Sequence, residues 1–134
     1  MSVEQGEHSF AVEVLISGEE LRGYTATEPI EQGQPVEIDG DYTVGVSGGD
    51  AFAGVALYDV AEGEELALAG DDCEVRIEAG EAIEGGDSIT VDAEGDFVVA
   101  TDRADQVGVA NTGGGAEDIV EVYLTDNLGN LGAE

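Results

Sequence analysis

The amino-acid sequence predicts an all-β protein, a compact β-barrel or sandwich built from two repeated units of about 54 residues. Three observations favour this fold. Twenty-one glycines interrupt short runs in which apolar and polar residues alternate, as in strands with one buried face. The chain has 134 residues, a common size for a single domain. The same series of glycine and aliphatic positions occurs twice along it.

The first six predicted strands are short and lie close together along the chain. In order they are residues 10–16, 36–38, 42–46, 51–58, 65–69 and 73–77. A turn at Asp39 and Gly40 joins the second and third strands as a hairpin. Residues 17–27 are expected to be a loop or a single helical turn. In the last of these strands Cys73, Val75 and Ile77 share one face, so Cys73 is expected to be a small core residue.

The second half of the chain resembles the first at a nearly constant offset. The matched segments are 30–39 with 83–92, 40–44 with 95–99 after a two-residue insertion, 54–56 with 108–110, and 66–68 with 120–122. The repeated units span residues 28–70 and 81–124. Each unit alone is near the size at which a hydrophobic core becomes marginal. We therefore expect one compact domain over residues 10–125, with an N-terminal arm at 1–9 and a flexible C-terminal tail at 126–134.

The charge composition points to a solvent of high salt. The chain has 32 acidic residues, three arginines, no lysine and a formal net charge of −29, while 42% of its residues are hydrophobic. Such a chain repels itself in dilute buffer, and the repulsion is screened in molar salt, where the Debye length is about 3 Å. Three arginines cannot neutralise a row of phosphates, so the sequence predicts no nucleic-acid partner and no anionic membrane partner. The acidic N-terminus lacks the features of a signal peptide, which predicts that the protein is made and kept inside the producing cell or leaves it by lysis.

The residues that carry most enzyme chemistry are nearly absent. His8 is the one histidine and Cys73 the one cysteine, so neither a nucleophile–base pair nor a usual zinc site is expected. The triple glycine at 113–115 lacks the lysine of a phosphate-binding loop and is interpreted as a flexible hairpin loop. The sequence therefore predicts no enzyme, no catalytic residue and no cofactor.

Acidic turns are the one candidate for metal binding. The carboxylates are Asp39, Asp41, Asp92, Glu94 and Asp96, which gather in the two matched hairpin turns. Hard cations prefer six to eight oxygen ligands, and neither turn has the spacing of a known calcium loop. Two interpretations stay open at this point, a weakly bound cation and a solvated turn.

The two units carry the same extended motif of glycine, acidic and aliphatic residues. Glu81-Ala82-Ile83-Glu84-Gly85-Gly86-Asp87-Ser88-Ile89-Thr90-Val91-Asp92-Ala93-Glu94-Gly95 is followed by Val107-Gly108-Val109-Ala110, and the first unit matches at Ile30, Gly33, Val36, Ile38, Gly40 and 54–66. This pattern resembles the small β-barrel head-decoration and capsid-stabilising proteins of tailed phages. The resemblance extends over about residues 24–124.

The resemblance implies a structural virion protein that decorates and stabilises an icosahedral capsid. With the acidic composition, it implies a tailed virus of a halophilic archaeon. The implied partners are the major capsid protein and two further copies of the chain in a homotrimer, on the capsid surface. The alternative hypothesis is a host-encoded β-barrel module of a halophilic archaeon that binds a small ligand or a sugar.

Overall fold

A computed structural model describes residues 13–49 and 51–125, and over these ranges the chain is all-β, as predicted. Eleven strands and one short 3₁₀ helix make up the described fold. The first six strands are β1 (Leu15–Ser17), β2 (Glu20–Ala26), β3 (Pro35–Gly40), β4 (Thr43–Val46), β5 (Phe52–Ala56) and β6 (Glu65–Ala69). The remaining elements are β7 (Glu74–Glu78), β8 (Ser88–Val91), β9 (Phe97–Val99), η1 (Arg103–Asp105), β10 (Gly108–Ala110) and β11 (Ile119–Leu124).

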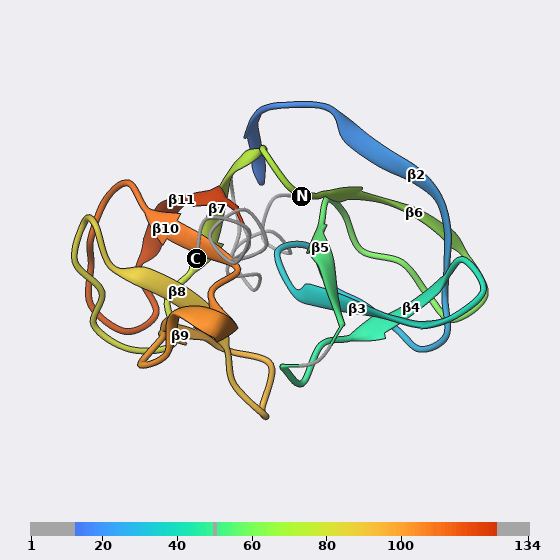
Figure 1. Cartoon of the computed structure of the whole chain (residues 1–134). Coiled ribbons are helices and arrows are strands. Elements are labelled where there is room, and N and C mark those ends of the chain that lie inside the picture. The colour runs from blue at the N-terminus through green and yellow to red at the C-terminus, as the bar shows by residue number, and fades with distance from the viewer. Residues whose placement is uncertain (1–12, 50, 126–134) are drawn as a thin grey trace.

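The strands form two units that lie side by side (Figure 1). The first unit, residues 20–69, is a closed barrel with the strand order β2-β4-β3-β5-β6. The second unit, residues 74–124, is part of a six-stranded sheet with the order β1-β7-β11-β10-β8-β9. Strand β1 lies outside both units in sequence and pairs with β7, so it is a cover strand on the second unit.

The two units share their pattern of strand partners. Val36 pairs with Val46 in the first unit, and Ile89 pairs with Val99 at the corresponding place in the second. The parallel pair Ala26 and Val44 has its counterpart, at the same offset along the chain, in the parallel bridge between Ala79 and Phe97. From β5 onward the offset is longer by a single position. We call residues that have equivalent strand partners in the two units matched positions. A common origin of the two units stays a prediction.

The matched ladders correct the sequence alignment of one hairpin. Both turns span five residues, 39–43 and 92–96, so no two-residue insertion separates them. The match of Tyr42 is therefore Gly95, and that of Val44 is Phe97. The alignment was wrong because it followed the glycines, whereas the ladders follow the buried residues opposite Ile38 and Val91.

Strand β2 corrects the prediction of a loop or helical turn at residues 17–27. Its alternation is broken by a bulge between Leu21 and Tyr24, where Gly23 has a φ of 97°. A bulge inserts an unpaired residue and hides the two-residue period of a strand from a sequence pattern. The predicted first strand, residues 10–16, corresponds only to β1 at its end, since residues 13 and 14 are not in a strand and 10–12 lie outside the described residues.

The hydrophobic core lies mainly in the second unit and at the junction of the two units. The larger cluster of buried residues includes Cys73, Val75 and Ile77, which confirms their predicted shared inward face. This cluster also takes in Val55 and Ala69 from the first unit. A smaller cluster, which includes Val36, Val44, Leu66 and Leu68, fills the barrel of the first unit. Because the larger cluster draws on both units, the two units pack against each other. A single domain over residues 10–125 stays a prediction.

Candidate interaction surfaces

The described part of the chain offers little for catalysis or metal binding. Within residues 13–49 and 51–125, no group of three or more histidine, cysteine or acidic side chains is placed to hold a metal ion. Cys73 is buried, its thiol donates a hydrogen bond of 3.4 Å to the carbonyl oxygen of Glu19, and burial raises its pKa. A buried thiol with a raised pKa is a poor nucleophile, so Cys73 is a core residue. His8 lies outside the described residues.

In the first acidic turn the carboxylate of Asp39 accepts two hydroxyl hydrogen bonds. Thr27 Oγ1 donates to Oδ2 at 2.7 Å, and Thr43 Oγ1 donates to Oδ1 at 2.8 Å. These two bonds stabilise the charged form and lower the pKa of Asp39. Asp41 lies in the same turn, between β3 and β4. The carboxylate of Asp39 thus holds the turn against β4 and the segment after β2.

The second acidic turn is organised around Asp92. Its Oδ1 accepts hydrogen bonds from the backbone N–H groups of Glu94 and Asp96, at 3.0 and 2.9 Å. Partial burial, together with the charges of Asp92 and Glu78, raises the pKa of Asp96. The structure keeps the two turns apart, with the first at the outer end of the first unit and the second at the junction of the units (Figure 1). Cation binding at either turn stays a prediction.

The triple glycine lies in the connection between β10 and β11 and is held by hydrogen bonds. Gly114 and Ile83 exchange two backbone hydrogen bonds of 2.9 Å, and Gly115 N–H donates to Asp118 Oδ2 at 2.8 Å. Ile30 and Val60 exchange the same pair of bonds in the first unit. The segment lies in a hairpin connection, as predicted, and the backbone amides of Gly114 and Gly115 are used within the fold. Its predicted flexibility stays a prediction.

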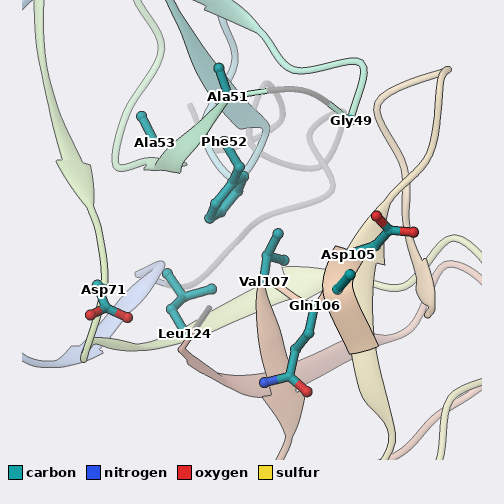
Figure 2. Close-up of a pocket in the computed structure, with 10 residues that line it drawn as sticks. Gly49, Ala51, Phe52, Ala53, Asp71, Asp105, Gln106, Val107 and Leu124 are labelled. Atoms are coloured by element: carbon teal, nitrogen blue, oxygen red, sulfur yellow. The ribbon is translucent and has the colours of Figure 1, made fainter. Parts of the chain in front are cut away.

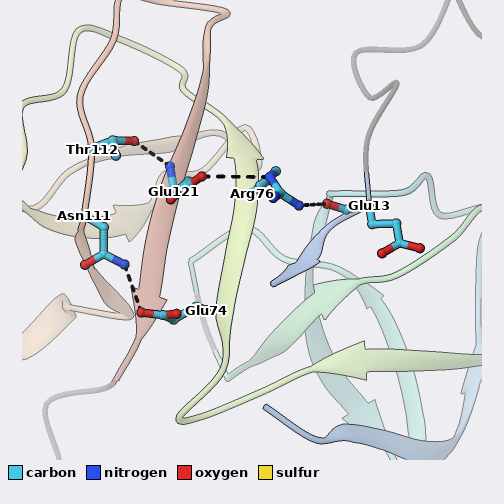
Figure 3. Close-up of polar contacts among 6 residues, drawn as sticks. All are labelled: Glu13, Glu74, Arg76, Asn111, Thr112 and Glu121. Atoms are coloured by element: carbon cyan, nitrogen blue, oxygen red, sulfur yellow. Dashed lines mark hydrogen bonds and ion pairs between the residues drawn. The ribbon is translucent and has the colours of Figure 1, made fainter. Parts of the chain in front are cut away.

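A network around Arg76 attaches the cover strand to the second unit (Figure 3). The Arg76 backbone N–H donates to the carbonyl oxygen of Val14 at 2.8 Å, and Nη1 donates to that of Glu13 at 3.0 Å. Arg76 Nε lies 3.9 Å from a carboxylate oxygen of Glu121 on β11. One arginine therefore links β7 to β11 and to the segment that leads into β1, which is a structural role.

A cleft of about 400 Å³ opens between the two units (Figure 2). Phe52, Val107 and Leu124 supply its apolar wall, and the buried Gln106 contributes a side-chain amide to its lining. Gln106 Oε1 accepts a hydrogen bond from Ser88 at 2.9 Å, and Nε2 donates to the carbonyl oxygen of Thr125 at 3.1 Å. Because this amide already has partners on both of its polar atoms, it ties the loop after η1 to β8 and to the end of β11.

Among residues 13–49 and 51–125, the most exposed large apolar side chain, that of Tyr42, is at the outer end of the first unit. Together with Tyr24 and Ile38 it forms what we call the hairpin-end patch, and the exposed fractions of Ile38 and Tyr42 are 45% and 70%. The rings of Tyr24 and Tyr42 lie 5.7 Å apart, centroid to centroid. This patch was not identified from the sequence. A signal for it was Tyr42, which occupies the position that Gly95 has in the matched turn. Exposed aromatic side chains of this kind are typical of protein interfaces.

The fold and these surfaces define a class of protein, an all-β protein that has exposed apolar side chains and, within residues 13–49 and 51–125, no cluster of metal-ligating side chains. The sequence matches the family model described as phage cement protein over residues 17–124. The chain therefore belongs to the phage cement protein family. It is a structural protein of the virion, associated with the capsid, and not an enzyme.

Among solved structures, the chain is similar to the N-terminal base of the head fiber protein gp8.5 of bacteriophage phi29. The TM-score is 0.63 at 18% sequence identity, over 80% of this chain and 93% of the phage chain. At that identity the likeness shows a common fold. No curated protein matches the chain by sequence.

Proposed function

We propose that this protein decorates and stabilises the icosahedral capsid of a tailed virus that infects a halophilic archaeon. The observation that carries the proposal is the match to the phage cement protein family over residues 17–124. The structure supports it in a second way. The described residues are two packed β units with their polar groups used in turns and ladders, which suits a protein that acts by binding.

The acidic composition supports the halophilic part of the proposal. Three arginines stand against 32 acidic residues, so most carboxylates cannot have a cationic side chain beside them. In molar salt their mutual repulsion is screened, and apolar contacts gain strength if the salt is one that is excluded from protein surfaces. The protein would thus bind the major capsid protein through apolar and backbone contacts. We propose that it does so as a homotrimer on the capsid surface after synthesis in the host cytoplasm.

Sedimentation of virus particles in molar salt tests the proposal. Particles carrying the protein are expected to retain it through a density gradient at about 3 M NaCl, where charge repulsion is screened. Particles stripped of it should release their genome at a lower temperature, and added protein should restore the original temperature. If the protein stays at the top of the gradient and its addition leaves the release temperature unchanged, the proposal fails.

The alternative, a host-encoded module that binds a small ligand or a sugar, has lost its support. In the cleft between the units, the amide that could have bound such a ligand, that of Gln106, is already bonded to Ser88 and Thr125. Membership of the phage cement protein family favours the capsid role.

A further inference from the structure

The hairpin-end patch has a matched face on the second unit, and that face is covered. The residues matched to Tyr24, Ile38 and Tyr42 are Ile77, Val91 and Gly95. Ile77 and Val91 are buried, with exposed fractions of 0% and 5%, whereas Ile38 is 45% exposed. The same part of the fold is therefore closed in the second unit and open in the first.

The first unit supplies part of that cover. A Cβ atom on Gly95 would lie 3.2 Å from the carbonyl oxygen of Ser47, and one on Gly49 would lie 3.1 Å from that of Val91. Residues 31–35 also line a small pocket together with Gly95, Asp96 and Phe97. The turn between β8 and β9 thus packs against residues 46–49 of the first unit and faces residues 31–35 across the small pocket. We call these two segments the acceptor face.

The residue at the tip of each turn reflects this difference. Tyr42 and Gly95 both have a left-handed backbone, with φ of 56° and 86°. Glycine adopts this conformation without strain, and its lack of a side chain permits the close approach to Ser47. Tyrosine adopts it only at a cost, and here its side chain is 70% exposed. Besides its contact with the ring of Tyr24, this exposed ring on a strained backbone is therefore a candidate for a contact outside its own chain.

The second unit carries an acceptor face of its own, matched to that of the first. Ser47 N–H donates to the carbonyl oxygen of Pro35, and Ala100 N–H donates to that of Ser88, so residues 84–88 and 99–102 are the matched segments. Glu84, Gly85, Thr101 and Asp102 are exposed. One chain therefore contains one closed junction between units and, on its outer surfaces, both halves of a second junction.

We infer that the hairpin-end patch of one copy docks on residues 84–88 and 99–102 of a second copy, head to tail, in the manner of the junction inside the chain. The inference rests on the proposed homo-oligomer and assigns its interface. A contact between two different surfaces of identical chains generates a closed ring when the rotation closes. Three copies would then present six units in a ring, with a tyrosine-containing turn at every junction between copies.

Variants of the patch test this assignment on the purified protein in molar salt, without virus particles. Tyr42→Gly installs the matched residue of the second unit and removes the backbone strain, so the fold is retained. It is expected to raise the dissociation constant of the oligomer at least about tenfold, because central aromatic residues dominate interfaces. Ile38→Thr should act in the same direction. Tyr58→Ser, at a tyrosine that is 44% exposed outside the patch, is the matched control and should leave the constant unchanged.

Cross-linking of single-cysteine variants then tests the head-to-tail geometry. Ala100 is matched to Ser47, so a mixture of Tyr42→Cys and Ala100→Cys chains should form a disulfide-linked pair on mild oxidation. Cys73 is buried and stays reduced in both. Light scattering that finds a monomer for the unmodified chain at all concentrations would overturn the inference. A Tyr42→Gly variant that assembles normally, or Tyr42→Cys chains that link only to each other, would do the same.

This experiment is independent of the test of capsid binding. A failure of the patch variants to dissociate would remove the assigned interface and leave the sedimentation result of the particles untouched. Conversely, a protein that assembles as inferred and yet does not sediment with particles would contradict the capsid role alone.

Discussion

The first unit and the second unit place matched residues in different surroundings. Val75 on β7 is fully buried, whereas Leu21 on β2, which pairs with Leu68 as Val75 pairs with Val122, is 41% exposed. Val75 pairs with Leu15 of the cover strand, and no strand among the described residues takes that place beside Leu21. Val91 and Ile38 differ in the same way at the hairpin ends. The second unit is therefore closed by β1 and by the first unit, while the first unit keeps its outer surfaces open for partners.

Lowering the salt concentration should have the largest effect, and it should act on the two units unequally. We expect the melting temperature to fall when salt is reduced below about 0.5 M, because the screening of the carboxylates is lost. The first unit, with its smaller buried cluster, should open first. Hydrogen exchange at several salt concentrations measures both effects. Equal melting temperatures in roughly 0.1 M and 3 M salt would contradict the solvent adaptation.

Truncation of matched side chains should have the second largest effect. The loss in the free energy of unfolding should be larger in the second unit than in the first. Ile77→Ala removes a fully buried side chain and should lower the free energy of unfolding by about 2–5 kcal/mol. Tyr24→Ala, at the matched half-buried position, should cost about 1 kcal/mol in the isolated chain. Urea unfolding in molar salt gives both values. Equal costs would show that the two positions are equally packed.

The two matched strands each carry an arginine, and removal of these arginines compares the covered strand with the open one. Arg76→Ala loses the hydrogen bond to Glu13 and should lower the free energy of unfolding by about 1–2 kcal/mol. Arg22→Ala loses one exposed ion pair with Glu20 and should change it by less than about 0.5 kcal/mol. In Arg76→Ala, faster hydrogen exchange of the backbone amide at position 76, which donates to Val14, would show that the lost stability comes from weaker attachment of β1.

The acidic turns should give the smallest effects, with opposite signs. The pKa of Asp39 is lowered in the fold, so its charge contributes stability above the ordinary value of 3.8 that is lost as pH falls through the folded pKa. Asp39→Asn should therefore destabilise the protein at neutral pH and less so in acid.

The pKa of Asp96 is raised, so its contribution is present at low pH and is lost as pH rises through the folded pKa. Asp96→Asn should therefore stabilise the protein at neutral pH, with a gain that disappears in acid. Stability curves of both variants against pH check the signs. If both substitutions changed the stability at neutral pH in the same direction, the two turns would have similar electrostatic surroundings.

The sequence predicted strands that have a clear apolar pattern. Burial alternates along β7, where the inward face of Cys73, Val75 and Ile77 is confirmed, and the apolar run predicted as a strand at 65–69 coincides with β6. It missed β2 because the bulge at Gly23 and the exposure of Leu21 remove the alternation. The hairpin-end patch was missed because the sequence does not show which of the two matched turns is packed against the other unit. That difference, with Gly95 covered and Tyr42 exposed, depends on how the units pack.

Electron cryomicroscopy of virus particles in molar salt tests the central claim most directly. We predict density for this protein on the outside of the capsid shell. In that density, the turn at Tyr42 of each copy should contact the segments at 84–88 and 99–102 of its neighbour. A shell of major capsid protein alone, in particles known to come from the virus that encodes this chain, would contradict the capsid role.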